Sequence, residues 1–148
     1  MYNFDNITAL GESTGNVVKD MSQYGNNGTV NGATWTGNGK RGGAYTFNGS
    51  SSYISIPSYA FSTNNTISAW IDFTNVNDTR YFLGNDTNSN GIRYNGSTLL
   101  IYAGNDNAAL TWNKINGFVH FVVARTTAQD YKIFINGEYL GTISLPSG

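Results

Sequence analysis

Few residues of this chain belong to the types that carry out catalysis. A glycoside hydrolase needs two carboxylates that flank the sugar bond, but glutamate occurs only at Glu12 and Glu138, and no predicted strand carries acidic residues at alternating positions. His120 is the only histidine, so a Ser-His-Asp triad would have to form around residues 117–125. Because cysteine is also absent, the chain lacks the usual ligands of a zinc site. We interpret His120 as a half-buried strand residue with a ring nitrogen bonded to the backbone. The sequence therefore predicts that the protein is not an enzyme.

Oxygen ligands for a metal ion are better represented. The segment KDMSQYGNNG, residues 19–28, places Asp20, Ser22, Asn26 and Asn27 within one irregular turn. Such side chains and the carbonyls of Gly-rich turns suit calcium, which accepts flexible coordination by about six to eight oxygens. In the alternative interpretation, the same side chains only cap their own turn.

Composition limits the class of protein and its partners. The chain has 148 residues, of which 39% are hydrophobic, and this is enough for one domain with a single core. Only 11% of the residues are charged and the net charge is −1, so the basic face that nucleic acid or anionic lipid requires is missing. There is no apolar stretch of membrane-spanning length, and we expect no direct membrane insertion.

Abundant Asn, Ser, Thr, Gly and Tyr replace charge as the source of polarity, which is typical of extracellular β proteins and predicts an extracellular or cell-surface location. Potential N-glycosylation triplets support this location, although a chain so rich in Asn, Ser and Thr also produces them by chance. They begin at Asn6, Asn27, Asn48, Asn64, Asn77, Asn85 and Asn95.

Short apolar runs with a period of two predict an all-β fold, a two-sheet antiparallel sandwich. The predicted strands are residues 2–5, 44–48, 53–57, 66–73, 81–84, 99–103, 118–125, 131–136 and 139–143. Asn95-Gly96 and Asn136-Gly137 predict type I′ hairpin turns. In the segment TISAWIDF, Ile67 and its alternate neighbours form a core face, whereas Trp70 lies on the other, half-covered face. The Gly/Asn-rich residues 25–43 are interpreted as a loop.

Polar and aromatic side chains gather in and beside the loops from residue 75 to residue 107. Aromatic rings can stack on sugar faces while Asn, Asp and Arg side chains bind hydroxyl groups, so these residues are the candidate glycan-binding set. Alternatively, each is an ordinary strand aromatic or turn residue. The candidates are Arg80, Tyr81, Asp86, Arg93, Tyr94, Tyr102 and Asn105.

The order of short motifs resembles the laminin-G-like, concanavalin A-like jelly-roll family. The resemblance begins with YNFD and continues through STGNVVKDMSQYGNNGTVNGATWTGNGKRGGAYTFNGSSSYISIP, with its Val-x-Asp-x-Ser turn and Gly-Gly-Ala-x-x-Phe-x-Gly strand. NTISAWIDF, GFVHFVVAR and YKIFINGEYLGTI extend it over nearly the whole chain, with Phe118 where the family usually has Trp.

The resemblance implies a single jelly-roll domain over residues 1–148, often with a structural calcium ion, in a protein that binds glycans or mediates adhesion. Carried over by motif, the calcium ligands would be Asp20 first, with Asn26, Asn27 and Asp5 as companions. The usual C-terminal closing strands do not follow the last hairpin. We therefore expect that those strands lie downstream, that residues 144–148 finish the sheet in a shortened form, or that a neighbouring subunit supplies a strand, because open sheet edges favour pairing with another chain.

Two functions follow from these observations. The first is a non-catalytic extracellular module that binds carbohydrate or mediates adhesion, with glycans or other surface macromolecules as partners. The alternative is a structural subunit of an extracellular fibre, coat or surface layer, in which copies of the chain assemble by sharing strands between subunits.

Overall fold

The structure of the protein is a computed structural model in which residues 1–12, 16–57, 64–77, 79–84, 90–103 and 106–146 are described. The described chain consists of β-strands and one short 3-10 turn, η1 (Thr8–Leu10). Its contacts divide it into two compact units, Met1–Ala60 and Phe61–Gly148. The prediction of a single domain over the whole chain stays a prediction.

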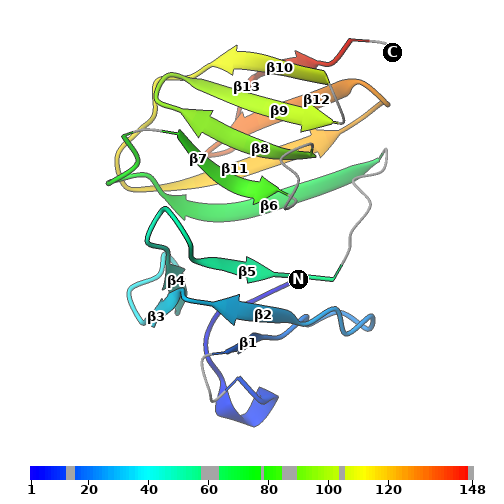
Figure 1. Ribbon diagram of the computed structural model, residues 1–148. Coiled ribbons are helices and arrows are strands. Elements are labelled where there is room, and N and C mark those ends of the chain that lie inside the picture. Colours follow the sequence, from blue (N-terminus) through cyan, green and yellow to red (C-terminus); the bar gives the residue numbers. More distant parts are fainter. Residues whose placement is uncertain (13–15, 58–63, 78, 85–89, 104–105, 147–148) are drawn as a thin grey trace. The chain divides into compact units, whose positions relative to one another are not determined.

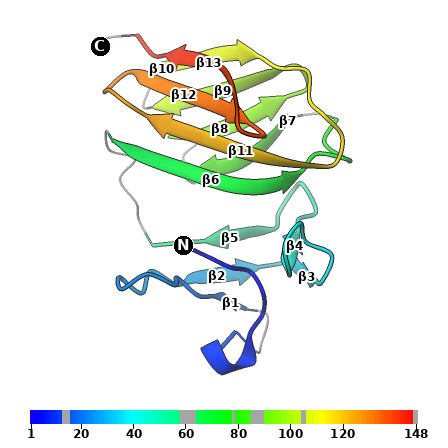
Figure 2. The same ribbon diagram turned by 180° about the vertical axis from the view of Figure 1, so that it is seen from behind.

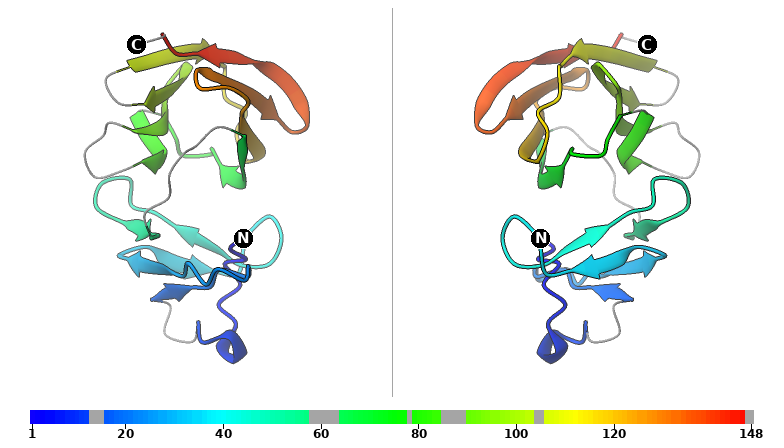
Figure 3. Two further views of the ribbon diagram at one scale, coloured as in Figure 1. Left: turned by 90° about the vertical axis from the view of Figure 1, so that its right-hand side faces the viewer. Right: turned by 90° about the vertical axis from the view of Figure 1, so that its left-hand side faces the viewer.

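The C-terminal unit is a sandwich of two four-stranded antiparallel sheets (Figures 1 and 2). One sheet has the order β10-β9-β8-β7 and the other has the order β13-β12-β11-β6. Figure 3 shows the two sheets facing each other. The strands are β6 (Asn65–Asp72), β7 (Thr79–Gly84), β8 (Asn90–Asn95), β9 (Thr98–Ala103), β10 (Asp106–Thr111), β11 (Phe118–Arg125), β12 (Asp130–Ile135) and β13 (Glu138–Ser144). The predicted all-β sandwich is confirmed.

The core of this unit lies between the two sheets. In β11, every second side chain is buried, and Phe121 meets Phe82 of β7 across the core with ring centroids 5.8 Å apart. Phe73 contacts Trp112 and Tyr94 edge-on at centroid distances of 5.0 and 6.0 Å. Edge-to-face packing of this kind adds to the stabilisation from burying apolar area.

Core-facing and outward-facing side chains alternate along β6, as the sequence predicts. Ile67 and Ile71 pack against the core, whereas Trp70 on the other face is 39% exposed. The paired register, in which Ile71 lies opposite Val119 of β11, keeps both apolar rows on one face of the sheet.

The two Asn-Gly hairpins have different geometries. Asn136 and Gly137 have φ values of 52° and 89°, and the flanking residues Ile135 and Glu138 are paired, which confirms the type I′ turn. At the other hairpin only Gly96 has a positive φ, 94°, and Asn95 does not. The hairpin exists, but the type I′ prediction is wrong there, because the Asn95 side chain accepts hydrogen bonds from Thr98 and closes a longer loop.

The N-terminal unit is built from shorter strands. A sheet has the order β1-β2-β5, and β3 pairs with β4. Their bounds are β1 (Val17–Val18), β2 (Gly28–Asn31), β3 (Thr34–Thr36), β4 (Ala44–Thr46) and β5 (Tyr53–Ser55). The interpretation of residues 25–43 as a loop is therefore wrong for β2 and β3. Buried Val18 and Val30 supply the apolar contacts of this sheet.

The predicted strand at residues 2–5 is wrong. Tyr2 makes only an isolated bridge with Asp20, and Phe4 has a positive φ of 58°, which extended strands exclude. The segment instead docks against β3 and the turn before β4: the Phe4 carbonyl accepts the Trp35 indole N–H at 3.0 Å, and Asp5 Oδ1 accepts the Gly43 N–H at 2.8 Å.

Glu12 lies buried in the same unit and is 1% exposed. Its two carboxylate oxygens accept the backbone N–H groups of Ile7 and Lys19, each at 2.8 Å. A buried carboxylate is tolerated when donors satisfy it in this way. Glu12 therefore fixes two loops to each other.

The Gly-Gly-Ala motif has a steric cause that can be tested. A Cβ at Gly43 would lie 2.5 Å from the Phe4 carbonyl oxygen and 2.6 Å from Trp35 Nε1. We expect Gly43→Ala to lower the free energy of unfolding by about 1 to 3 kcal/mol through overpacking. Gly37→Ala is the matched control, because its added Cβ would meet Trp35 at an ordinary 3.6 Å. Equal thermal-unfolding midpoints for the two variants would contradict this explanation.

Candidate ligand-binding surface

The outer face of the β7–β10 sheet carries the main cluster of predicted site residues. Ile92 and Tyr94 of β8 point into the core and are fully buried, so Arg93 between them points outward. The register places Arg93 opposite Tyr81 of β7, and it places Gly91 opposite Tyr102 of β9. Tyr81, Arg93 and Tyr102 therefore share one face and are called the Arg93 cluster below.

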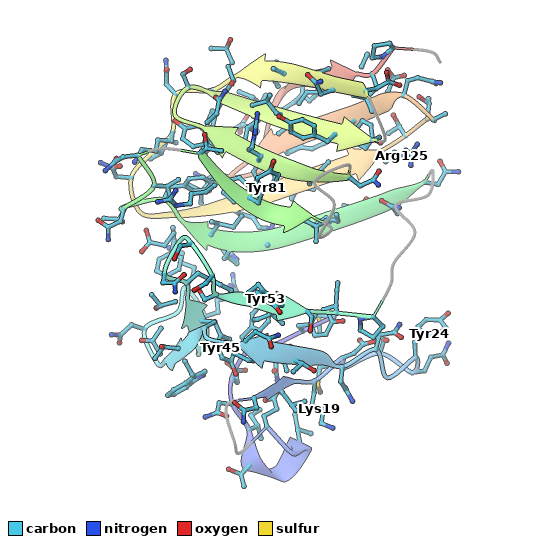
Figure 4. All side chains as sticks on the ribbon, viewed as in Figure 1. Lys19, Tyr24, Tyr45, Tyr53, Tyr81 and Arg125 are labelled. Carbon is cyan, nitrogen blue, oxygen red and sulfur yellow. The ribbon has the colours of Figure 1, made fainter. Side chains whose placement is uncertain are left out.

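The three side chains of the Arg93 cluster contact each other. The guanidinium carbon of Arg93 lies 4.8 Å from the ring centroid of Tyr102 and 5.6 Å from that of Tyr81, both within cation–π range. Arg93 Nη1 also donates a long hydrogen bond, 3.4 Å, to the Tyr81 hydroxyl. Tyr81 is 43% exposed, and Figure 4 shows it on β7, on the sheet nearer the viewer.

Two glycines lie next to the Arg93 cluster. The register continues the row of Tyr102 into Gly91 and Gly84, two glycines side by side on β8 and β7. Thr98 and Thr111 are paired further along β9 and β10. On the same face, Leu100 of β9 lies opposite Arg93 and Asn107 of β10 lies opposite Tyr102. The cluster therefore has bare backbone beside it at Gly84 and Gly91 and larger side chains at Leu100 and Asn107.

Two further predicted ligand residues that the structure describes, Tyr94 and Arg80, are not part of the cluster. Tyr94 is 0% exposed, packs on Trp112 and donates its hydroxyl to the Gly96 carbonyl at 2.5 Å. It belongs to the core, not to the surface on which the prediction placed it. Arg80 lies opposite Tyr94 in the register and donates to the Thr79 carbonyl at 2.8 Å. Asp86 and Asn105 lie outside the described residues.

The predicted calcium ligands are only partly brought together. Asp20 and Asn26 share one turn with Asn27, whose Oδ1 accepts the Asp20 N–H at 3.1 Å. Asp5 instead binds Gly43.

The oxygens of the turn are occupied by protein donors. Asp20 Oδ1 accepts the Ser22 N–H and the Met1 amino group, each at 2.9 Å, and Oδ2 accepts the Ser22 hydroxyl at 2.7 Å and the Asn26 N–H at 3.1 Å. This arrangement fits a self-capped turn better than a set of free metal ligands. Among the described residues, no group of three or more His, Cys, Asp and Glu side chains could hold a metal ion. Calcium binding stays a prediction.

His120 has a partner that the sequence did not indicate. Its Nε2 lies 2.9 Å from the Ser68 hydroxyl, and its ring lies 5.1 Å from the Trp70 ring, both on the neighbouring strand β6. Its backbone N–H, not its ring, is held by Asn136 Oδ1 at 2.9 Å. The expected ring-to-backbone bond is therefore replaced by a cross-strand contact, which only the β6–β11 register could reveal.

Comparison with known proteins places the fold in a family. The profile of a laminin-G-like family, described as the concanavalin A-like lectin/glucanases superfamily, matches residues 47–148. The chain belongs to this family. The matched residues include the whole described sandwich of the C-terminal unit, and the resemblance is confirmed. No curated protein and no solved structure matches the chain at a significant level.

Membership in the concanavalin A-like family supports a lectin-like or adhesion-type module. Within the described part of this laminin-G-like chain, no helix has the length and apolar character needed to cross a bilayer.

The turn at Asp20 makes stability depend on pH. Hydrogen bonds from Ser22, the Met1 amino group and Asn26 hold the pKa of the Asp20 carboxyl below its ordinary value. Because the folded pKa is lowered, the stabilisation is complete above the unfolded pKa of about 3.9 and is lost as pH falls through the folded pKa.

We expect Asp20→Asn to unfold at a lower temperature than the unchanged chain at pH 7, and the difference to shrink as pH falls below about 4. Melting curves across this pH range, with calcium and with chelator, check both points. A difference that appears only with calcium would contradict the self-capped turn and favour a metal site.

Proposed function

We propose that the chain is a non-catalytic extracellular module that binds carbohydrate through the Arg93 cluster. The observation that carries the proposal is the convergence of Tyr81, Arg93 and Tyr102 on the outer face of one sheet of a concanavalin A-like sandwich. Aromatic rings offer apolar faces to sugar rings, and a guanidinium offers several N–H donors to their oxygens. The bare backbone at Gly84 and Gly91 leaves room beside these side chains for part of a saccharide.

An extracellular location is part of the proposal, and the potential glycosylation sites support it. Asparagines within the N-x-Ser/Thr triplets are exposed at several described positions, where a glycan could be attached without disturbing the core. These are Asn27, Asn48, Asn64, Asn77 and Asn95.

The proposal predicts a specific loss of binding. On a glycan array followed by calorimetry with the best saccharide, Tyr81→Ala should weaken affinity about tenfold, the effect of removing an aromatic anchor. Tyr139→Ala is the matched control, because Tyr139 is an even more exposed tyrosine, 57%, on the opposite sheet. Tyr94→Phe should lower stability by about 1 kcal/mol through the lost hydroxyl bond but leave affinity unchanged. Equal losses for Tyr81→Ala and Tyr139→Ala would contradict the site.

The assembly of copies by strand sharing is the second candidate function. One observation favours it: β6 is the terminal strand of its sheet, runs over eight residues and carries only one charged residue, Asp72. Long edge strands with little charge and no proline tend to pair with other strands.

This second function predicts oligomers that depend on concentration. Thr66→Lys places a charge on β6, and lysine on an edge strand opposes pairing with another chain. In sedimentation, the unchanged chain should form oligomers and the variant should be monomeric. Asn113→Lys adds the same charge to an exposed loop residue between β10 and β11 and should not change the mass. A monomeric unchanged chain at all concentrations would exclude strand sharing.

A further inference from the structure

We infer that the saccharide bound by the Arg93 cluster is acidic, with a uronate carboxylate or a sulfate ester held by the Arg93 guanidinium. The inference rests on the proposed function and names the chemical class of its ligand. It depends on three features of Arg93: the absence of a carboxylate contact among the described residues, the burial of its Nε atom and its aromatic flanks.

Arg93 carries a charge that the described protein does not neutralise. Among the described residues, no carboxylate forms a salt bridge with its guanidinium. Its single side-chain hydrogen bond there is the long one to the Tyr81 hydroxyl. Cation–π contacts with the two tyrosines offset part of the cost of desolvation but supply no acceptor for the N–H groups.

One donor of Arg93 is buried, although the side chain as a whole is partly exposed. Its Nε atom is buried and has no hydrogen-bond partner among the described residues. An unpartnered buried donor is destabilising, and more so when the group is charged. A charged side chain held in this state on a sheet face is suited to a ligand that provides both a negative charge and acceptor oxygens.

The geometry around Arg93 favours a carboxylate or sulfate on a sugar. The planar fork of a guanidinium pairs two N–H groups with two oxygens of one anion, which a point charge does not do. Tyr81 and Tyr102 hold the guanidinium from two sides and present aromatic surface next to it. A pyranose ring with an acidic substituent matches this combination, with its ring on a tyrosine and its anionic group on Arg93.

Net charge argues for a specific contact instead of general attraction to polyanions. The whole chain has a net charge of −1, so acidic polymers gain no overall electrostatic attraction. A preference for acidic saccharides would therefore have to come from Arg93 itself. An acidic peptide has the same anionic group without the sugar ring and serves as the comparison ligand.

Calorimetry with the full chain tests the inference with four probes of matched length: a galacturonate oligomer, an O-sulfated galactose oligomer, a neutral galactose oligomer and a peptide of Asp and Glu. We expect at least one acidic oligomer to bind about tenfold or more tightly than the neutral one, the usual contribution of a charged hydrogen-bonded pair. Binding of the acidic oligomer should weaken in high salt. Whether the galacturonate oligomer or the O-sulfated oligomer binds shows whether Arg93 holds a carboxylate or a sulfate.

Substitutions at Arg93 locate the effect. Arg93→Gln should remove the preference for the acidic oligomer, and Arg93→Lys, which keeps the charge but not the fork, should retain only part of it. Lys132→Gln removes an exposed cation on β12 and should change nothing. Thermal melting identifies any variant that fails to fold, and Arg93→Lys then provides the decisive comparison.

Each remaining outcome overturns a defined part of the inference. Equal affinity for acidic and neutral oligomers, or an acidic preference that survives Arg93→Gln, overturns the role of Arg93 and leaves the proposed function intact. Binding of the acidic peptide without any saccharide overturns the ligand class. Absence of saccharide binding on a wide glycan array, in addition to these probes, overturns the proposed function itself.

Discussion

The inward row of β11 is the constraint on which the C-terminal unit depends. Val119, Phe121 and Val123 are almost fully buried, and β11 is paired with β6 on one side and β12 on the other. A shift of one residue in either register would move this row to the outer face and expose it to water. Side chains alternate between the two faces in the opposite sheet as well, so the burial of Tyr94 directs Arg93 to the outer face. The core therefore determines which side chains a ligand can meet.

Much of the sandwich could be predicted because its strands obey local rules. The alternation of β6 and the Asn136-Gly137 turn are determined by a few adjacent residues, and both were correct. Predictions failed where distant contacts decide the backbone. Phe4 takes a positive φ in a segment docked on Trp35 and Gly43, 31 or more positions away, and no periodicity in residues 2–5 indicates this.

The sequence indicated the region of the candidate site, but not which of its side chains lie on the outer face of the sheet. Tyr81, Arg93 and Tyr102 were selected because polar and aromatic residues gather between residues 75 and 107, and the structure brings these three together. Tyr94 was selected by the same criterion but is a core residue. Sequence proximity cannot separate Arg93 from Tyr94, because adjacent strand residues point to opposite faces and only the register with β7 and β9 assigns them.

The docking of the N-terminal segment has a consequence for the order in which the chain acquires structure. The hairpins of the C-terminal unit join residues that are close in sequence, whereas the Asp5–Gly43 hydrogen bond closes a loop of 38 positions. Closing longer loops costs more chain entropy and slows folding. Both partners of this segment, Trp35 and Gly43, lie in or beside the hairpin of β3 and β4. We therefore expect residues 2–5 to dock only after that hairpin has formed, and until then their backbone is open to proteases and chaperones.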